Sequence, residues 1–209
     1  DNEDVYHSDP SSSPALDASQ KNDLAFNADH LQVMGMAGGL DDQEFFFSSK
    51  VAGKKNEDYL AKYLPEAKKN GLRSIVYFNV HWFKRSFGEK HPDWLQMDEN
   101  GNGNQIMYSQ PSSRFCVNSP WREWVFQVVR DLCAYPIDGI FYDGPGFTVN
   151  TCYCHYCQDK YQKQYSEKLP SKKQRKGKPA LDLLEFQANS IANFLRDSHA
   201  VIRSVNQEI

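Results

Sequence analysis

The chain has 209 residues, of which 40% are hydrophobic and 13% aromatic, enough to bury the core of one globular domain. Its formal net charge of -3 supplies no positive field for a nucleic acid or an anionic membrane, so neither is expected as a partner. No apolar run approaches the roughly 20 residues that span a bilayer, and the polar start has no signal-peptide pattern. We therefore expect a soluble protein, of a compartment that the sequence does not assign.

The first half of the chain reads as an arm followed by the start of an α/β domain. Residues 1–25 are rich in Ser, Asp, Asn and Pro, which predicts an irregular arm, and residues 26–209 form the domain. The apolar run 30–36 is typical of a buried strand. Residues 56–71 have apolar positions at helical spacing, with Asn56 as the predicted N-cap. The β-branched and aromatic run 72–80 predicts a second strand.

The second half continues the alternation. Residues 81–105 are expected to form a long loop and residues 113–117 a short strand. Ser119 then precedes a helix at 120–134 with Pro120 at its favoured first position. A strand at 137–143 and two helices, at 158–169 and 181–205, complete the pattern, and the basic linker 171–179 between these helices is interpreted as a solvated loop.

Strands that alternate with helices predict an α/β protein with a parallel sheet. About four βα units correspond to the first half of a (β/α)8 TIM barrel, and the last helix reads as still running at Ile209, so we expect a piece of a longer protein. An open doubly wound sheet is the alternative. The first strand is not followed by a G-x-G-x-x-G loop, which argues against nucleotide binding, and no organic cofactor is expected.

Polar and aromatic residues gather where the predicted strands end, the edge at which such barrels place their active sites. They combine a carboxylate, an imidazole, a guanidinium, amides and rings, which suits a carbohydrate. The candidate catalytic residue is Asp143, although Asp in an Asp-Gly-Pro-Gly run also favours a turn. The candidate substrate-binding residues are Asn79, His81, Trp82, Arg114, Asn118 and Tyr142.

The cysteines predict a metal site. Cys152, Cys154 and Cys157 form a C-x-C-x2-C loop, and Cys116 at the end of the preceding predicted strand is the natural fourth ligand for a tetrahedral zinc ion. His155 is an alternative fourth ligand, and disulfides or free thiols are further alternatives. Four thiolates would leave no open coordination position, so the zinc would be structural.

The segments FCVNSPWREWV, DGIFYDGPGF and CYCHYC resemble the first half of the catalytic barrel of family 42 glycoside hydrolases and, more strongly, the related hypothetical glycosyl hydrolase families. In family 42 this resemblance implies a structural zinc shared by the four matching cysteines. Two departures matter. Pro145 stands where that family has its acid/base glutamate, and the family's sugar-binding arginine falls on Ser112, with Arg114 two residues further on. The strand FYDG also resembles that of α-L-fucosidases, in which the Asp is the nucleophile.

Together these features predict a domain that hydrolyses O-glycosidic bonds, with Asp143 as nucleophile or acid/base. A glycosidase normally uses two carboxyl groups. The second would lie outside this chain, so the 209-residue piece is expected to be inactive alone. A non-catalytic carbohydrate-binding barrel and a module in which zinc or the thiols are themselves the function remain alternatives. The sugar, the linkage, the stereochemical outcome and the oligomeric state are not predicted.

Overall fold

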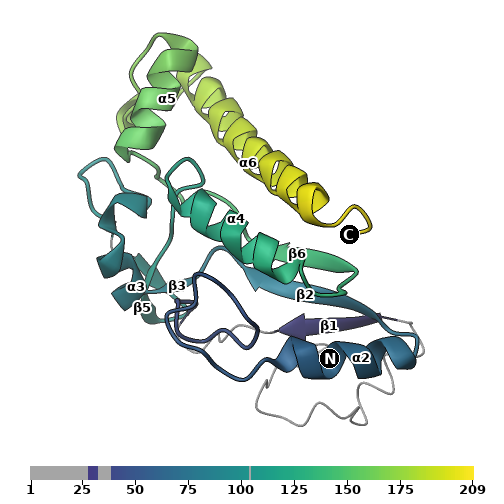
Figure 1. Ribbon diagram of the computed structural model, residues 1–209. Helices are drawn as coiled ribbons and strands as arrows, with labels where there is room; N and C mark the ends of the chain where they lie inside the picture. The colour runs from purple at the N-terminus through teal and green to yellow at the C-terminus, as the bar shows by residue number, and fades with distance from the viewer. Residues whose placement is uncertain (1–27, 33–38, 104) are drawn as a thin grey trace, which may run out of the picture.

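A three-stranded parallel sheet organises the molecule (Figure 1). The structure, a computed structural model, describes residues 28–32, 39–103 and 105–209. In this part of the chain the sheet has the order β1 (Ala28–Gln32), β2 (Arg73–Asn79), β6 (Gly139–Asp143). Helices α2 (Tyr59–Lys69) and α4 (Trp121–Leu132) occur in the connections between successive strands, and the α/β class is therefore confirmed.

The register of β2 and β6 places two of the predicted site residues at one edge of the sheet. Asn79 is paired with Asp143, and Tyr77 with Phe141. Because the strands are parallel, their carboxyl ends meet at the same edge. The expected strand ends at Asn79 and Asp143 therefore lie side by side.

The expected strand at 113–117 is wrong. The nearby strand is β5 (Gln110–Ser113), which lies in a separate antiparallel sheet between β3 (Phe83–Lys84) and β4 (Gln105–Met107). Phe115 makes only an isolated bridge to Leu95, and the segment owes its apolar character to burial rather than to strand pairing. As a result, Asp143 ends the third parallel strand of the described chain and not the fourth.

The long connection after β2 is also more ordered than the sequence predicts. It holds helix α3 (Arg85–Lys90), the 3-10 turn η2 (Pro92–Trp94) and the hairpin β4–β5. Tyr108 and Ser109 form the two-residue hairpin turn with φ values of 49° and 62°. Residues of this type seldom occupy positive φ, so the turn escapes detection from composition.

The N-cap of helix α2 lies two residues after the predicted one. The carboxylate of Asp58, not the side chain of Asn56, accepts the backbone N–H of Ala61 at 2.9 Å. The Asn56 amide instead donates to the carbonyls of Gln43 and Phe45, each at 2.8 Å, and so fastens the loop before the helix. The helix ends at Lys69, and Gly71 follows with a φ of 75°.

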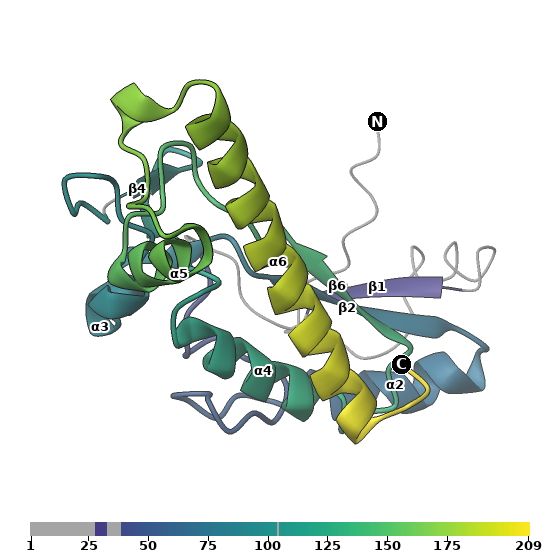
Figure 2. The ribbon, with the colours of Figure 1, turned by 90° about the horizontal axis from the view of Figure 1, so that it is seen from above.

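The C-terminal helices agree with the sequence in number and place. They are α5 (His155–Tyr165) and α6 (Lys178–Val205), with the 3-10 turn η3 (Lys172–Gln174) in the basic linker. Figures 1 and 2 show α6 lying along α4. Phe194 of α6 stacks on Trp121 of α4 with ring centroids 5.6 Å apart. No helix among the described residues is both long and apolar enough to cross a membrane.

The core lies on the helix side of the sheet. In β2 the side chains of Val76 and Phe78 are fully buried, whereas on the opposite face Ile75 of β2 is 36% exposed and Phe141 of β6 is 49% exposed. One face of the described sheet is therefore packed, and the other is partly exposed. A second apolar cluster surrounds the four predicted metal ligands, with Tyr161, Leu183 and Phe186. The predicted arm at 1–25 and part of the predicted first strand lie outside the described residues.

Candidate functional site

Asp143 is the carboxylate at the centre of the candidate site. Its side chain is 36% exposed at the end of β6. The phenol of Tyr77, on the neighbouring strand, donates a hydrogen bond to Oδ2 of Asp143. The imidazole Nδ1 of His81 lies 3.4 Å from the same oxygen and 3.0 Å from the backbone carbonyl of Asp143. Two side chains from β2 and its following turn thus orient one carboxylate.

Asn79 builds the turn that carries His81 and Trp82. Its Oδ1 accepts the backbone N–H groups of both residues at 3.0 Å, and its Nδ2 donates to the carbonyl of Trp82 at 2.6 Å. The side chain is only 1% exposed. Its polar groups are engaged within the turn, so Asn79 positions the site rather than facing a substrate.

His81 and Trp82 meet an aromatic residue that the sequence did not single out. Tyr108, at the tip of the β4–β5 hairpin, has its ring centroid 4.7 Å from that of Trp82 and its hydroxyl 3.4 Å from Nε2 of His81. Tyr108 is 67% exposed. Trp82 and Tyr108 form an aromatic wall beside His81, of the kind that packs on the C–H face of a sugar.

Tyr77 was missed as well, but it could have been found. It precedes Asn79 by two residues in a strand, so the two side chains share a face of the sheet. Tyr108 could not be found in this way, because only the hairpin brings it to His81.

Arg114 lies on the same side as this group. Its guanidinium donates to the carbonyl of Gly144 at 3.4 Å, and its Nε is buried without a hydrogen-bond partner. Burial lowers the pKa of Arg114, while Tyr108 and Asp143 oppose that shift. The structure therefore brings together Asp143, His81, Trp82 and Arg114.

Tyr142 and Asn118 lie elsewhere. Tyr142 points to the opposite face of the sheet, where its hydroxyl bonds to that of Ser198 in α6 and burial raises the pKa of Tyr142 to about 12. Asn118 lies beside the cysteines, and its Nδ2 is 3.3 Å from Sγ of Cys157. Neither side chain reaches the carboxylate.

Four cysteines form a compact group, although the first and the last of them are 41 positions apart in the sequence. The sulfurs of Cys116, Cys152, Cys154 and Cys157 all lie within 4.8 Å of one another, and each side chain is buried. The sulfurs of Cys116 and Cys157 are 3.3 Å apart, and none of the described cysteines is in a disulfide. His155 is exposed and does not belong to the group.

The donor set fits a tetrahedral thiolate site. Four sulfurs bound to one zinc ion at ~2.3 Å would be ~3.8 Å apart, within the spread of this cluster. Burial raises the pKa of Cys116, whereas hydrogen bonds from the other three thiols lower the pKa of Cys152. Cys154 is the N-cap residue of α5. The group could hold a metal ion.

Gln96 connects the carboxylate strand to the cysteine loop. It is 1% exposed and donates to the carbonyls of Phe115 and Gly146 at 3.0 and 2.7 Å. Its Oε1 accepts from the backbone of Thr148 and the hydroxyl of Thr151, each at 2.8 Å. One buried amide therefore fixes the segment that runs from β6 to the first cysteine of the loop.

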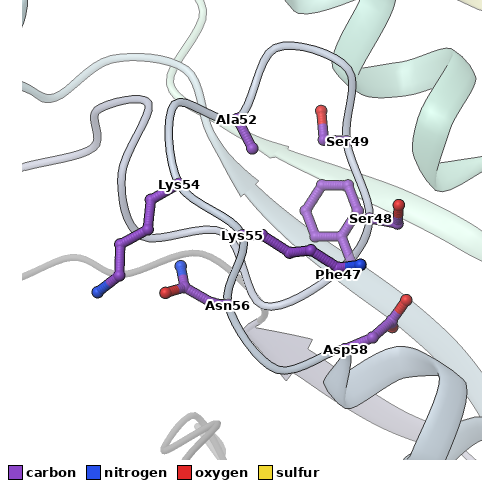
Figure 3. A pocket seen from close by; sticks show the side chains of 8 residues that line it. All are labelled: Phe47, Ser48, Ser49, Ala52, Lys54, Lys55, Asn56 and Asp58. Atoms are coloured by element: carbon purple, nitrogen blue, oxygen red, sulfur yellow. The ribbon is translucent and has the colours of Figure 1, made fainter.

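Two hollows in the described surface lie away from these residues. One of about 370 Å³ is lined by the loop before α2 and includes Phe47, Lys54, Lys55 and Asp58 (Figure 3). Another of about 230 Å³ lies at the amino end of β2, near Ser74 and Asp138.

Comparison with known proteins decides the family. A family model described as hypothetical glycosyl hydrolase 6 matches residues 25–144, which include β2, the aromatic wall, Arg114 and Asp143. The chain belongs to this family. A search of curated proteins found no match.

Solved structures place this hypothetical glycosyl hydrolase 6 member among glycoside hydrolase folds. The α-L-fucosidase isoenzyme 2 of Paenibacillus thiaminolyticus matches with a TM-score of 0.65 and 21% identity over 97% of this chain and 30% of the other. The β-galactosidase of Bacillus circulans sp. alkalophilus matches with a TM-score of 0.64 and 14% identity over 98% and 35%. The PgaB (BpsB) glycoside hydrolase domain of Bordetella bronchiseptica matches with a TM-score of 0.70 and 14% identity over 98% and 62%. The chain spans about a third of the first two relatives.

Proposed function

We propose that this chain is the first part of a (β/α)8 glycoside hydrolase domain that cleaves O-glycosidic bonds of a carbohydrate. The carrying observation is the environment of Asp143, a carboxylate at the carboxyl end of a parallel strand, oriented by Tyr77 and His81 beside an aromatic wall. That edge is where barrels of this type place their chemistry. The family match supports the same reaction class.

Asp143 acts as the nucleophile in this proposal. The phenol of Tyr77 donates to Oδ2, and Nδ1 of His81 lies 3.4 Å from the same oxygen, so the carboxylate is held in one orientation. A carboxylate held in this way can attack the anomeric carbon through an oxocarbenium-like transition state. Pro145 also removes the family 42 acid/base from this strand. The partner carboxyl group, at ~5 Å for a retaining enzyme, comes from a part of the protein outside this chain.

The sugar is held by the groups around that carboxylate. Trp82 and Tyr108 stack on its apolar face, and the guanidinium group of Arg114 donates to a hydroxyl of the sugar. His81, fixed by the Asn79 turn, donates through Nδ1 and keeps the carboxylate in place. With one carboxyl group alone, the 209-residue piece is inactive.

Isosteric replacement of the carboxylate tests the assignment. In the full-length protein, Asp143→Asn is expected to lower turnover of an aryl glycoside, selected from a panel, by at least about 10³-fold, with binding of the sugar retained. Asp143→Gly is expected to regain activity with added azide, which replaces the missing nucleophile. Asp159→Asn, on the exposed surface of α5, serves as the matched control.

The outcomes separate the candidate functions. Full activity of Asp143→Asn would overturn the role of this carboxylate. Sugar binding by the wild-type protein without turnover of any glycoside in the panel would favour the non-catalytic carbohydrate-binding barrel.

We further infer that the four cysteines hold one structural zinc ion. The support is a closed donor set of four buried sulfurs within 4.8 Å. Such an ion supplies no reaction step and braces the segments around Cys116 and the cysteine loop. Metal analysis of protein purified without chelator should find one zinc per chain, and a chelator should lower the melting temperature. A metal-free protein with four reactive thiols would instead favour the redox alternative.

A further inference from the structure

A network of polar side chains, Asn118, Lys160 and Ser190, lies on one side of the cysteine cluster. No motif in the sequence predicts it. Asn118 donates its backbone N–H to Sγ of Cys116 at 3.4 Å and its Nδ2 to Sγ of Cys157 at 3.3 Å. One residue thus supplies hydrogen bonds to two of the four sulfurs. Such donors stabilise thiolates and, in metal sites, tune the ligands they contact.

Lys160 determines which way the Asn118 amide points. Its Nζ donates to Oδ1 of Asn118 at 2.6 Å. Because an ammonium group is a donor only, the oxygen of the amide must face Lys160, and the NH2 group must then face the sulfur. With the amide turned over, its oxygen would lie against the thiolate and repel it.

Ser190 completes the network from α6. Its hydroxyl, 1% exposed, accepts from Nδ2 of Asn118 at 3.1 Å and lies 3.4 Å from Nζ of Lys160. The ammonium group also lies 6.0 Å from the ring centroid of Phe186. The network therefore joins the Cys116 segment, α5 and α6 around one side of the cluster.

We propose that Asn118, held in a single orientation by Lys160 and Ser190, is a positioning residue that sets the affinity of the four-cysteine site for its metal ion. The inference rests on the proposed zinc site and goes beyond it, because it assigns the strength of metal binding to residues that are not ligands. Lys160 contacts the amide oxygen of Asn118 and is not itself a metal ligand. Its effect on the sulfurs passes through the Asn118 amide.

Metal competition measures this directly, without reference to enzymatic activity. Zinc-loaded protein is titrated with a chromophoric chelator, and the cobalt form is followed by its sulfur-to-metal charge-transfer absorption. Lys160→Met removes the ammonium group and keeps much of the side-chain length. We expect it and Asn118→Ala each to weaken metal binding by about 10- to 100-fold, the usual effect of losing an outer-shell partner. Lys163→Met, an exposed lysine on the same helix, is the matched control and should not change the affinity.

The double variant, Asn118→Ala with Lys160→Met, tests whether Lys160 acts on the sulfurs through Asn118. If Lys160 acts through the amide, Lys160→Met should add less than about threefold to the loss already caused by Asn118→Ala. Unchanged metal affinity and an unchanged cobalt spectrum in both single variants would overturn the inference while leaving the zinc site intact. A wild-type protein that binds neither zinc nor cobalt would overturn the zinc site and the inference together. Independent, multiplying losses would show that Lys160 does not work by orienting Asn118.

Discussion

Gly144 follows the candidate nucleophile and allows His81 to lie against the backbone. It has a φ of 71°, and a Cβ built there would lie 2.8 Å from Cγ and 2.9 Å from Nδ1 of His81. The histidine cannot easily move away, because its backbone N–H is bound to Asn79 and its ring contacts the carbonyl of Asp143. Gly144→Ala should therefore combine backbone strain with a steric clash.

The two contributions can be separated with a second glycine. Gly101 has a φ of 78°, but a Cβ at this position meets nothing within 4 Å. Gly101→Ala should cost about 1 kcal/mol from the left-handed backbone alone. Gly144→Ala should cost about 2–4 kcal/mol, since overpacking adds roughly 1–3 kcal/mol to a similar strain. The difference between the two variants measures the contact with His81.

Urea denaturation followed by circular dichroism gives both free energies of unfolding, provided that the slopes against urea agree with the wild-type slope. In a His81→Ala background the clash is relieved, so the effect of Gly144→Ala should fall toward that of Gly101→Ala. If Gly144→Ala and Gly101→Ala destabilise the protein equally, the packing of His81 on Gly144 is wrong. The placement of His81 against Asp143 would fall with it.

Two further predictions concern buried side chains other than Asp143 and its neighbours. Gln96→Leu should lower the free energy of unfolding by roughly 3 kcal/mol, because four hydrogen bonds lose their shared partner. Hydrogen exchange of the backbone amides of residues 146–151 should become faster. Unchanged exchange in this segment would refute the role of Gln96 in holding it. Burial raises the pKa of Cys133 from 9.0 to about 11 and that of Tyr142 from 10.0 to about 12, so the fold favours their neutral forms. Their contribution to the free energy of unfolding is complete below pH 9 and is lost as the pH rises through about 11 to 12. The free energy of unfolding measured from pH 8 to 12 should therefore fall, and it should fall less steeply in Tyr142→Phe than in the wild type. Equal slopes in the two proteins would contradict the burial of this phenol.

Local pattern was sufficient for the elements that carry strong periodicity. The buried run before Asn79, the amphipathic helix after Pro120 and the strand ending at Asp143 all appear in the structure near their predicted bounds. The predictions failed where a residue is buried but is not paired in a regular strand. Phe115 is buried but does not belong to a strand of the main sheet. The hairpin turn at Tyr108 and Ser109 has residue types that do not predict a turn with positive φ.

The sequence by itself determined the α/β class, the strand that delivers Asp143 and the four cysteines as one group. These depend on the period of apolar residues and on short spacings, which are local properties of the chain. Only the tertiary structure decided that Tyr108 reaches His81 beside the carboxylate, and that Asn118 lies against the sulfur of Cys157. Such contacts depend on the register of β2 with β6 and on where a hairpin and two helices come to rest. They join residues tens of positions apart, so no local pattern could have specified them.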